Sequence, residues 1–187
     1  MDGKRYRLKV TLRGARPPIW RRLEVDAAVT LVNLHDILQV VMGWTDSHLH
    51  QYRRGSTYYG QSDPEFEMRR EDERRIRLNQ VLRKPKDRMV YEYDFGDGWE
   101  HDVVLESSGV VAEGGSSVRV VAGKGACPPE DVGGIGGYYR FLKAIQDPKD
   151  PEHHDMLEWG GPFDPNAFDI NELNKYFQKT RRRRKDA

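Results

Sequence analysis

The segment YDFGDGWEH, residues 93–101, constrains the fold of this chain more than any other stretch. Two glycines bracket Asp97, and apolar and polar residues alternate on both sides of them over residues 88–106. This pattern is typical of an antiparallel β-hairpin, and a turn at Gly96-Asp97-Gly98 places a glycine where a left-handed backbone is needed. The sequence therefore predicts a hairpin over residues 88–106.

The expected register puts Phe95 opposite Trp99, which makes one face of the hairpin aromatic and aliphatic, with the pairs Tyr93–His101, Tyr91–Val103 and Met89–Leu105. The other face then pairs like charges, Asp94 with Glu100 and Glu92 with Asp102. Because like charges directly opposite one another destabilise a hairpin, something must neutralise them. A bound cation could do so, but solvent and neighbouring arginines are favoured, namely Arg21, Arg22, Arg53 and Arg54.

Segments on either side of the hairpin predict an α+β domain. Strands are expected at 6–12 and 19–25, and Arg21 falls among the apolar positions of the second, which requires a bulge or an acidic partner. A helix over Leu31–Val41 follows, with Thr30 as its N-cap, Gly43 at its end, and His35 beside the apolar stripe in a structural role. Strand, strand, helix is a β-grasp-like start.

The remaining pattern predicts strand and turn over 48–60, an exposed loop or short helix over 61–75, a helical turn over 78–82 and a strand over 118–122. Helices are expected near 137–146 and 170–179, with room for a short one between them. The expected fold class is thus α+β: a single domain, 1–179, with a mostly antiparallel sheet, one helix packed on it, and a helical C-terminal third. Residues 180–187 are expected to form a basic disordered tail.

Charge and cysteine content limit the possible partners and compartment. The last eight residues carry a net charge of +4, so the other 179 carry −3, and the body is not the basic surface of a dedicated DNA-binding domain. The tail residues Arg181, Arg182, Arg183, Arg184 and Lys185 could still attract nucleic acid nonspecifically. With Cys127 as the single cysteine no internal disulfide forms, which favours the cytoplasm, and no apolar run is long enough to span a membrane.

Several polar residues are candidates for a ligand cleft. His48 and His50 are expected on one face of a strand, and His/carboxylate sets bind transition metals. The hairpin adds Tyr93, Asp94, Asp97 and His101, and the segment before the glycine run DVGGIGGYYR adds Cys127, Glu130 and Asp131. Cys127 could be a nucleophile, although a buried apolar role is favoured. No Cys-x-x-Cys, His-Glu-x-x-His or phosphate-loop motif occurs in the sequence.

Five segments, taken in order, resemble the plasmid pRiA4b ORF-3-like family: IWRRLEV (19–25), LHDILQVVMGWTDSHLHQY (34–52), YDFGDGWEHDVVLE (93–106), CPPEDVGGIGGYYRFLKAI (127–145) and EWGGPFDPNAFDINELN (158–174). The resemblance covers about residues 4–178 and leaves the basic tail outside. It implies a compact α+β domain in a family found on plasmids, mobile elements and ordinary chromosomes. It implies no activity.

Two functions from different classes fit these observations. The first is a non-enzymatic binding module for a protein or a nucleic acid. The second is a metal-dependent hydrolase or nuclease that uses a His/Asp/Glu cluster with a divalent metal. If the cleft exists, His48 or His50, Asp94 or Asp97, and Glu130 or Asp131 should lie within about 10 Å of one another. The oligomeric state does not follow from the sequence.

Overall fold

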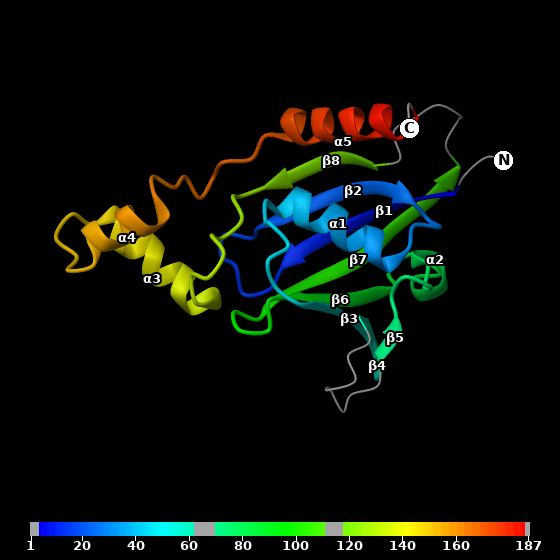
Figure 1. Cartoon of the computed structure of the whole chain (residues 1–187), viewed down its shortest axis with the longest axis horizontal. Helices are drawn as coiled ribbons and strands as arrows, with labels where there is room; N and C mark the ends of the chain where they lie inside the picture. The colour runs from blue at the N-terminus through cyan, green and yellow to red at the C-terminus, as the bar shows by residue number, and fades with distance from the viewer. Residues whose placement is uncertain (1–3, 62–69, 111–117, 186–187) are drawn as a thin grey trace.

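The computed structural model of the chain describes residues 4–61, 70–110 and 118–185, and its centre is an eight-stranded sheet (Figure 1). The strands are β1 (Lys4–Leu12), β2 (Trp20–Asp26), β3 (His50–Arg54), β4 (Thr57–Gly60), β5 (Arg70–Asp72), β6 (Arg88–Tyr93), β7 (Trp99–Val110) and β8 (Val118–Lys124). They lie in the order β5-β4-β3-β6-β7-β1-β2-β8. Every neighbouring pair is antiparallel except β4 and β5, which are parallel.

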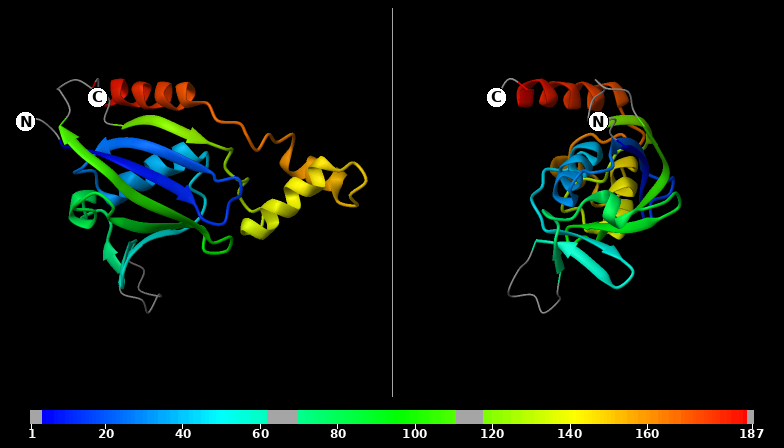
Figure 2. Two further views of the ribbon diagram at one scale, coloured as in Figure 1. Left: turned by 180° about the vertical axis from the view of Figure 1, so that it is seen from behind. Right: turned by 90° about the vertical axis from the view of Figure 1, so that its right-hand side faces the viewer.

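Five helices in the described residues accompany the sheet: α1 (Leu31–Met42), α2 (Leu78–Val81), α3 (Gly134–Gln146), α4 (His153–Gly160) and α5 (Ile170–Lys185). Figures 1 and 2 show α1 across one face of the sheet, α5 along the edge strand β8, and α3 with α4 beyond one end of the sheet. The α+β class is right in broad terms. The predicted picture of one helix on a mostly antiparallel sheet with a helical C-terminal third is wrong, because the sheet is mixed and the described residues form five helices.

The predicted hairpin is present as β6 and β7, but its register differs by two residues from the expected one. Tyr93 pairs with Trp99 rather than His101, so five residues, 94–98, form the loop. Asp94 begins this loop with a φ of 58°, and Gly98 ends it with a φ of 65°. Because side chains alternate with a period of two, a two-residue shift leaves every side chain on its predicted face.

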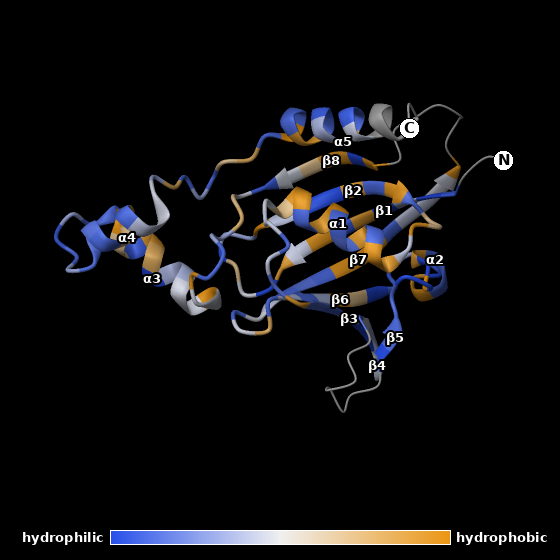
Figure 3. Cartoon of the chain, viewed as in Figure 1, coloured by the Kyte–Doolittle hydropathy of each residue, from blue (hydrophilic) through white to orange (hydrophobic). Residues whose placement is uncertain are grey.

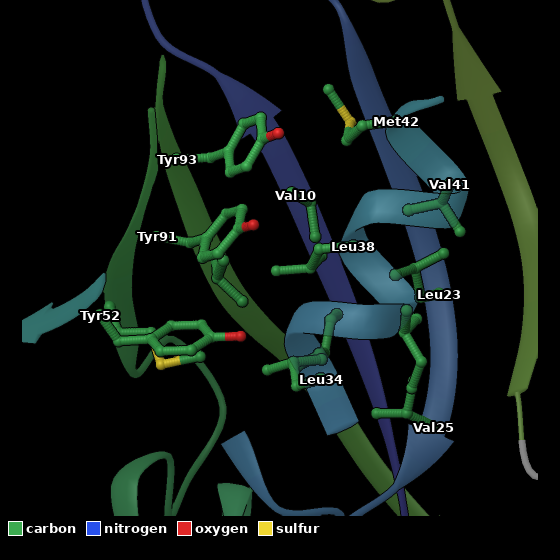
Figure 4. Packing of buried hydrophobic residues seen from close by; sticks show 14 of the residues in the cluster. Val10, Leu23, Val25, Leu34, Leu38, Val41, Met42, Tyr52, Tyr91 and Tyr93 are labelled. Carbon is green, nitrogen blue, oxygen red and sulfur yellow. The ribbon is translucent and has the colours of Figure 1, made fainter. Parts of the chain in front are cut away.

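Buried aromatic residues of the hairpin and β3 pack against α1. Tyr52, Tyr91 and Tyr93 point toward the helix, where Leu34 and Leu38 are fully buried (Figure 4). Thr30 caps the helix by accepting a hydrogen bond from the Asn33 amide at 3.4 Å, and Gly43 ends it with a φ of 95°. The predicted helix and both of its caps are therefore confirmed.

Arginines neutralise the acidic face of the hairpin, as predicted, although the main one is Arg13. Its guanidinium lies 2.6 Å from Glu100 and 2.7 Å from Asp102, and Arg53 lies 3.4 Å from Glu100. Arg22 pairs with Glu106 at 2.7 Å. Arg21 is buried and pairs with no acidic side chain of the described residues: it donates to the carbonyls of Val41 at 2.7 Å and of Trp20 and Lys124 at 3.0 Å.

The C-terminal helix α5 is largely hydrophilic and turns Ile170, Leu173 and Phe177 toward the core (Figure 3). Asn174 donates to the Val120 carbonyl at 3.0 Å and accepts from the Val120 amide at 2.9 Å. Its side chain therefore forms hydrogen bonds with backbone groups of the edge strand β8. The helix continues to Lys185, where a disordered tail was expected from residue 180.

Of the predicted segment 61–75, residues 62–69 lie outside the described residues, and 70–72 form β5.

Candidate functional site

Three loops that are far apart in sequence meet at one end of the sheet. They are the loop after α1 (residues 43–49), the hairpin loop (94–98) and the loop before α3 (125–133). Asp97 at the hairpin tip accepts a hydrogen bond from the Gly133 amide at 3.1 Å. The contact is close, since a Cβ atom built on Gly134 would lie 2.5 Å from the Asp97 carbonyl oxygen. The role of Asp97 is therefore to dock the hairpin on the start of α3.

His48, Asp94 and Asp131 form the centre of this junction, one from each loop. The His48 Nε2 atom lies 3.1 Å from Asp131 Oδ1 and 3.9 Å from Asp94 Oδ2. One donor atom from each of the three side chains falls within 4.8 Å of the others. The geometric convergence expected from the sequence is therefore present, while a ligand for these residues stays a prediction.

Glu130 lies in the same loop as Asp131 but is fully engaged in fixing the junction. Its carboxylate accepts 2.5 Å hydrogen bonds from the hydroxyls of Tyr93 and Thr45, and the Ser47 amide donates to the Tyr93 hydroxyl at 3.0 Å. Burial acts to raise the pKa of Glu130, but the hydrogen bonds from Thr45 and Tyr93 lower it overall. Glu130 is thus a carboxylate that ties the loops together, which leaves it poorly suited to act as a general base.

His50 has different polar partners from His48, which precedes the strand and was predicted to share one strand face with His50. β3 begins at His50. The ring of His50 stacks on the ring of His35, with centroids 3.5 Å apart and planes 5° apart. The Nε2 atom of His50 lies 2.8 Å from the buried carboxylate of Glu73. His50 therefore belongs to a second cluster behind the junction.

The second cluster includes a closed ring of hydrogen bonds that the sequence did not reveal. Gln39 donates to the Tyr91 hydroxyl at 2.9 Å, and that hydroxyl lies 2.8 Å from His35 Nδ1. His35 Nε2 lies 2.7 Å from Asp46, whose own amide donates to Gln39 at 2.9 Å. Burial, and then the neighbouring His50, lower the pKa of His35. The ring holds Asp46, at a φ of 57°, and with it the loop that carries His48.

This second cluster is a poor metal site, although His35, Asp46 and His50 also bring donor atoms within 4.8 Å of one another. The lone pair of an imidazole nitrogen lies in the plane of its ring. Two parallel rings 3.5 Å apart cannot both place one ion in their planes. His35, moreover, already uses both of its nitrogens. The arrangement supports the loop from behind and does not present ligands.

Two further candidates have structural positions: His101 is a core residue, and the partly buried Cys127 packs against the core. His101 is fully buried and lies edge-on to Trp44 at 5.2 Å, and burial lowers its pKa to about 4. Burial raises the pKa of the Cys127 thiol, which leaves it protonated at neutral pH and unsuited to nucleophilic attack. Neither residue contributes to the junction of His48, Asp94 and Asp131.

Comparison with known proteins agrees with the resemblance of the five segments. The family model described as "Plasmid pRiA4b ORF-3-like protein" matches residues 4–172. The chain belongs to the plasmid pRiA4b ORF-3-like family. A curated relative, the uncharacterized protein y4hQ of Sinorhizobium fredii (strain NBRC 101917 / NGR234), is 40% identical over 172 residues, which are 90% of this chain and 88% of the relative.

A solved structure shares the fold. The crystal structure of the protein of unknown function MM3350 from Methanosarcina mazei Go1 has a TM-score of 0.83 and 32% identity, and the match covers 92% of this chain and 98% of that chain. The two relatives and the family carry no described activity. In this member of the pRiA4b ORF-3-like family, the junction is built from the segments 34–52, 93–106 and 127–145, which are among those that carried the resemblance.

A groove of about 770 Å³ runs between α1 and α5 in this pRiA4b ORF-3-like protein. Its apolar lining is Val29, Ile37, Val40, Trp44, Val118 and Phe177. Among the side chains that the structure describes, its charged lining is Asp26, Asp36 and Asp46 with Arg77, a net charge of −2. Tyr176 of α5 lies in the lining and keeps 49% of its surface exposed. This groove could not be predicted from the sequence, because its two walls are helices about 130 residues apart in the chain.

Proposed function

We propose that this protein is a non-enzymatic binding module that takes up a basic, amphipathic segment of another protein in the groove between α1 and α5. The observation that carries the proposal is the combination of an apolar lining with an acidic rim in one groove. Its volume of about 770 Å³ is within the usual range for ligand pockets. A helix with apolar residues on one face and lysine or arginine beside them complements such a groove.

Charge separates the two kinds of partner that the sequence left open. Asp26, Asp36 and Asp46 would repel the phosphates of a nucleic acid, whereas they would attract lysine and arginine side chains. The exposed ring of Tyr176 adds the type of aromatic contact that dominates many protein interfaces. A protein partner is therefore favoured at the groove. Arg181–Lys185, at the end of α5, remain the predicted contact for any nonspecific nucleic-acid binding.

Titration with a synthetic amphipathic peptide tests the proposal. A peptide with a leucine face and a lysine face should bind the full chain, as measured by calorimetry, and the same peptide with glutamate in place of lysine should not. Replacing the exposed Asp36 of α1 by lysine should weaken binding by about tenfold or more. The matched control is Asp155→Lys, an exposed position on α4 away from the groove, which should bind like the unchanged chain.

Three results would count against the groove. They are equal binding of the glutamate peptide, unchanged affinity in Asp36→Lys, and tight binding of a duplex oligonucleotide by a chain shortened to residue 179. The third result would move the recognition surface to a nucleic-acid site on the body of the protein.

A cytoplasmic location, proposed from the lone cysteine, is compatible with a partner protein there. None of the described helices has both the length and the hydropathy to cross a bilayer.

A metal-dependent hydrolase is the second candidate, and the convergence of His48, Asp94 and Asp131 is the observation in its favour. A metal held by three protein ligands leaves positions for a water molecule and a substrate. Against it, the nearby carboxylate of Glu130 is occupied by Tyr93 and Thr45. Hydrolysis of a generic phosphodiester with added Mn²⁺, lost in His48→Gln, would favour the hydrolase over the binding module.

A further inference from the structure

We propose that His48, Asp94 and Asp131 form a binding site for one divalent transition-metal ion, and this inference is independent of the groove. The three side chains come from three different loops, and each directs a donor atom to the same place. The contacts of His48 Nε2 measure 3.1 Å to Asp131 and 3.9 Å to Asp94. Ligands held at about 2.1 Å from a tetrahedral Zn²⁺ lie about 3.4 Å apart, so small side-chain movements suffice.

One polar atom at this place, His48 Nε2, lacks the hydrogen bond that a purely structural role would give it. His48 Nε2 is shielded from solvent and forms no hydrogen bond of good geometry, even with Asp131 so near. A buried nitrogen without a hydrogen bond is costly, and a bound cation would satisfy it. The Asp94 side chain is only 10% exposed. A nearly buried carboxylate also needs a positive partner.

The backbone presents both carboxylates in an unusual way. Asp94 has a φ of 58° and Asp131 a φ of 59°, the left-handed region that residues other than glycine rarely occupy. Asp94 Oδ1 accepts a hydrogen bond from the Gly96 amide at 2.9 Å, which leaves Oδ2 facing His48. Strained backbone of this type persists where the surroundings enforce it, and it concentrates at ligand sites.

Local charge also favours a cation. Asp94, Glu130 and Asp131 bring three carboxylates to the junction, and His48 faces Asp94 and Asp131 directly. Tyr93 and Thr45 donate hydrogen bonds to Glu130, but because both groups are uncharged they do not cancel its negative charge. Asp131 keeps 69% of its side chain exposed, so the site opens to solvent and an ion can enter. Hydrated positions on the ion would face outward beside Asp131.

The donor set indicates which ions fit. One imidazole nitrogen with two carboxylate oxygens suits Zn²⁺, Mn²⁺ or Fe²⁺, whereas Ca²⁺ and Mg²⁺ prefer oxygen ligands alone. Cu⁺, which prefers sulfur, has no thiolate in the set. We therefore expect Zn²⁺ to bind more tightly than Mn²⁺, following the general order of divalent affinities, and Mg²⁺ to bind far more weakly.

Metal titration of the full chain, chelator-treated and without a histidine tag, tests the site. One equivalent of Zn²⁺ should bind in calorimetry, and Co²⁺ should give visible absorption bands of a nitrogen/oxygen site that Zn²⁺ abolishes. Asp131→Asn and His48→Gln should each weaken Zn²⁺ binding at least tenfold. The exposed side chain of Asp131 makes Asp131→Asn safe for folding, and equal melting temperatures without metal would show this.

The matched controls are His154→Gln and Asp155→Asn, exposed residues on α4 that should leave the affinity unchanged. Absence of a stoichiometric Co²⁺ spectrum would overturn the proposal. So would a Zn²⁺ affinity that is unchanged in both Asp131→Asn and His48→Gln, because the ion would then bind elsewhere. The titration separates this inference from the groove, since the leucine/lysine peptide does not involve His48 or Asp131.

Discussion

A single glycine, Gly98, decides whether the hairpin loop can close. Its φ of 65° lies in the left-handed region, and a Cβ atom at this position would have no neighbour within 4 Å. Gly98→Val should therefore lower the free energy of unfolding by about 1 kcal/mol or more through backbone strain alone, because there is no steric clash to add. Urea unfolding followed by circular dichroism measures the change.

Gly109 is the matched control at the same scale. It lies exposed in β7, also without neighbours within 4 Å of a Cβ atom, and its φ is not positive. Valine is favoured in strands, so Gly109→Val should leave stability unchanged or raise it. If Gly98→Val were as stable as Gly109→Val, the loop would not require a left-handed residue at position 98.

Between elements, the contact that matters most for the junction is the one between the hairpin tip and α3. Gly134 begins α3 with a φ of 67°, and a Cβ atom there would lie 2.5 Å from the Asp97 carbonyl oxygen. Gly134→Ala should push the hairpin loop away from α3 and destabilise the protein by roughly 1–3 kcal/mol. It should also weaken any metal binding, because Asp94 and Asp131 lie on the two sides of this contact.

Gly136, two residues further along α3, provides the comparison. It has no atom within 4 Å of a built Cβ and no positive φ, so Gly136→Ala should stabilise the helix by up to about 1 kcal/mol. Thermal unfolding of the two variants gives the test. Equal stability of Gly134→Ala and Gly136→Ala would contradict a tight contact between the hairpin tip and α3.

Elements with local signals could be predicted from the sequence, and contacts between distant elements could not. Thr30 and Gly43 marked both ends of α1, and the glycines of the hairpin marked its turn, because capping and turn chemistry depend on a few neighbouring residues. The predicted register was wrong by two residues because Asp94 adopts the left-handed conformation. An aspartate in the sequence indicates that conformation less clearly than a glycine does. The parallel pairing of β4 with β5 left no local pattern either.

The residues of the candidate site show the same difference between local signals and long-range contacts. Asp94 and Asp131 were found because they lie in polar segments with more charge than their own turns need. Glu73 was missed, and so was the cluster as a whole, since it depends on the stack of His35 on His50 and on the buried contact between His50 and Glu73. His35 was correctly predicted to be a structural residue beside an apolar helix face. Its closed ring of hydrogen bonds with Gln39 and Tyr91 could not be predicted, because it depends on tertiary structure.

For the molecule as a whole, buried histidines should make stability depend on pH. The pKa of His101 falls from an ordinary 6.5 to about 4 in the folded protein because the ring is fully buried. Below pH 6.5 the unfolded chain binds a proton at this residue and the folded chain does not, so stability falls as the pH drops toward 4. The loss from His101 should be on the order of 2 kcal/mol at pH 5 relative to pH 8.

Burial lowers the pKa of His35 as well, and it therefore adds a loss of the same sign. Urea unfolding between pH 8 and pH 5 measures the slope, and His101→Gln should make it shallower while costing some stability at pH 8, because the amide fills the core less well. The exposed His154→Gln should leave the slope unchanged. A slope in His101→Gln as steep as in the unchanged chain would assign the acid sensitivity to other groups, and His35→Gln would then show whether the stack on His50 is responsible.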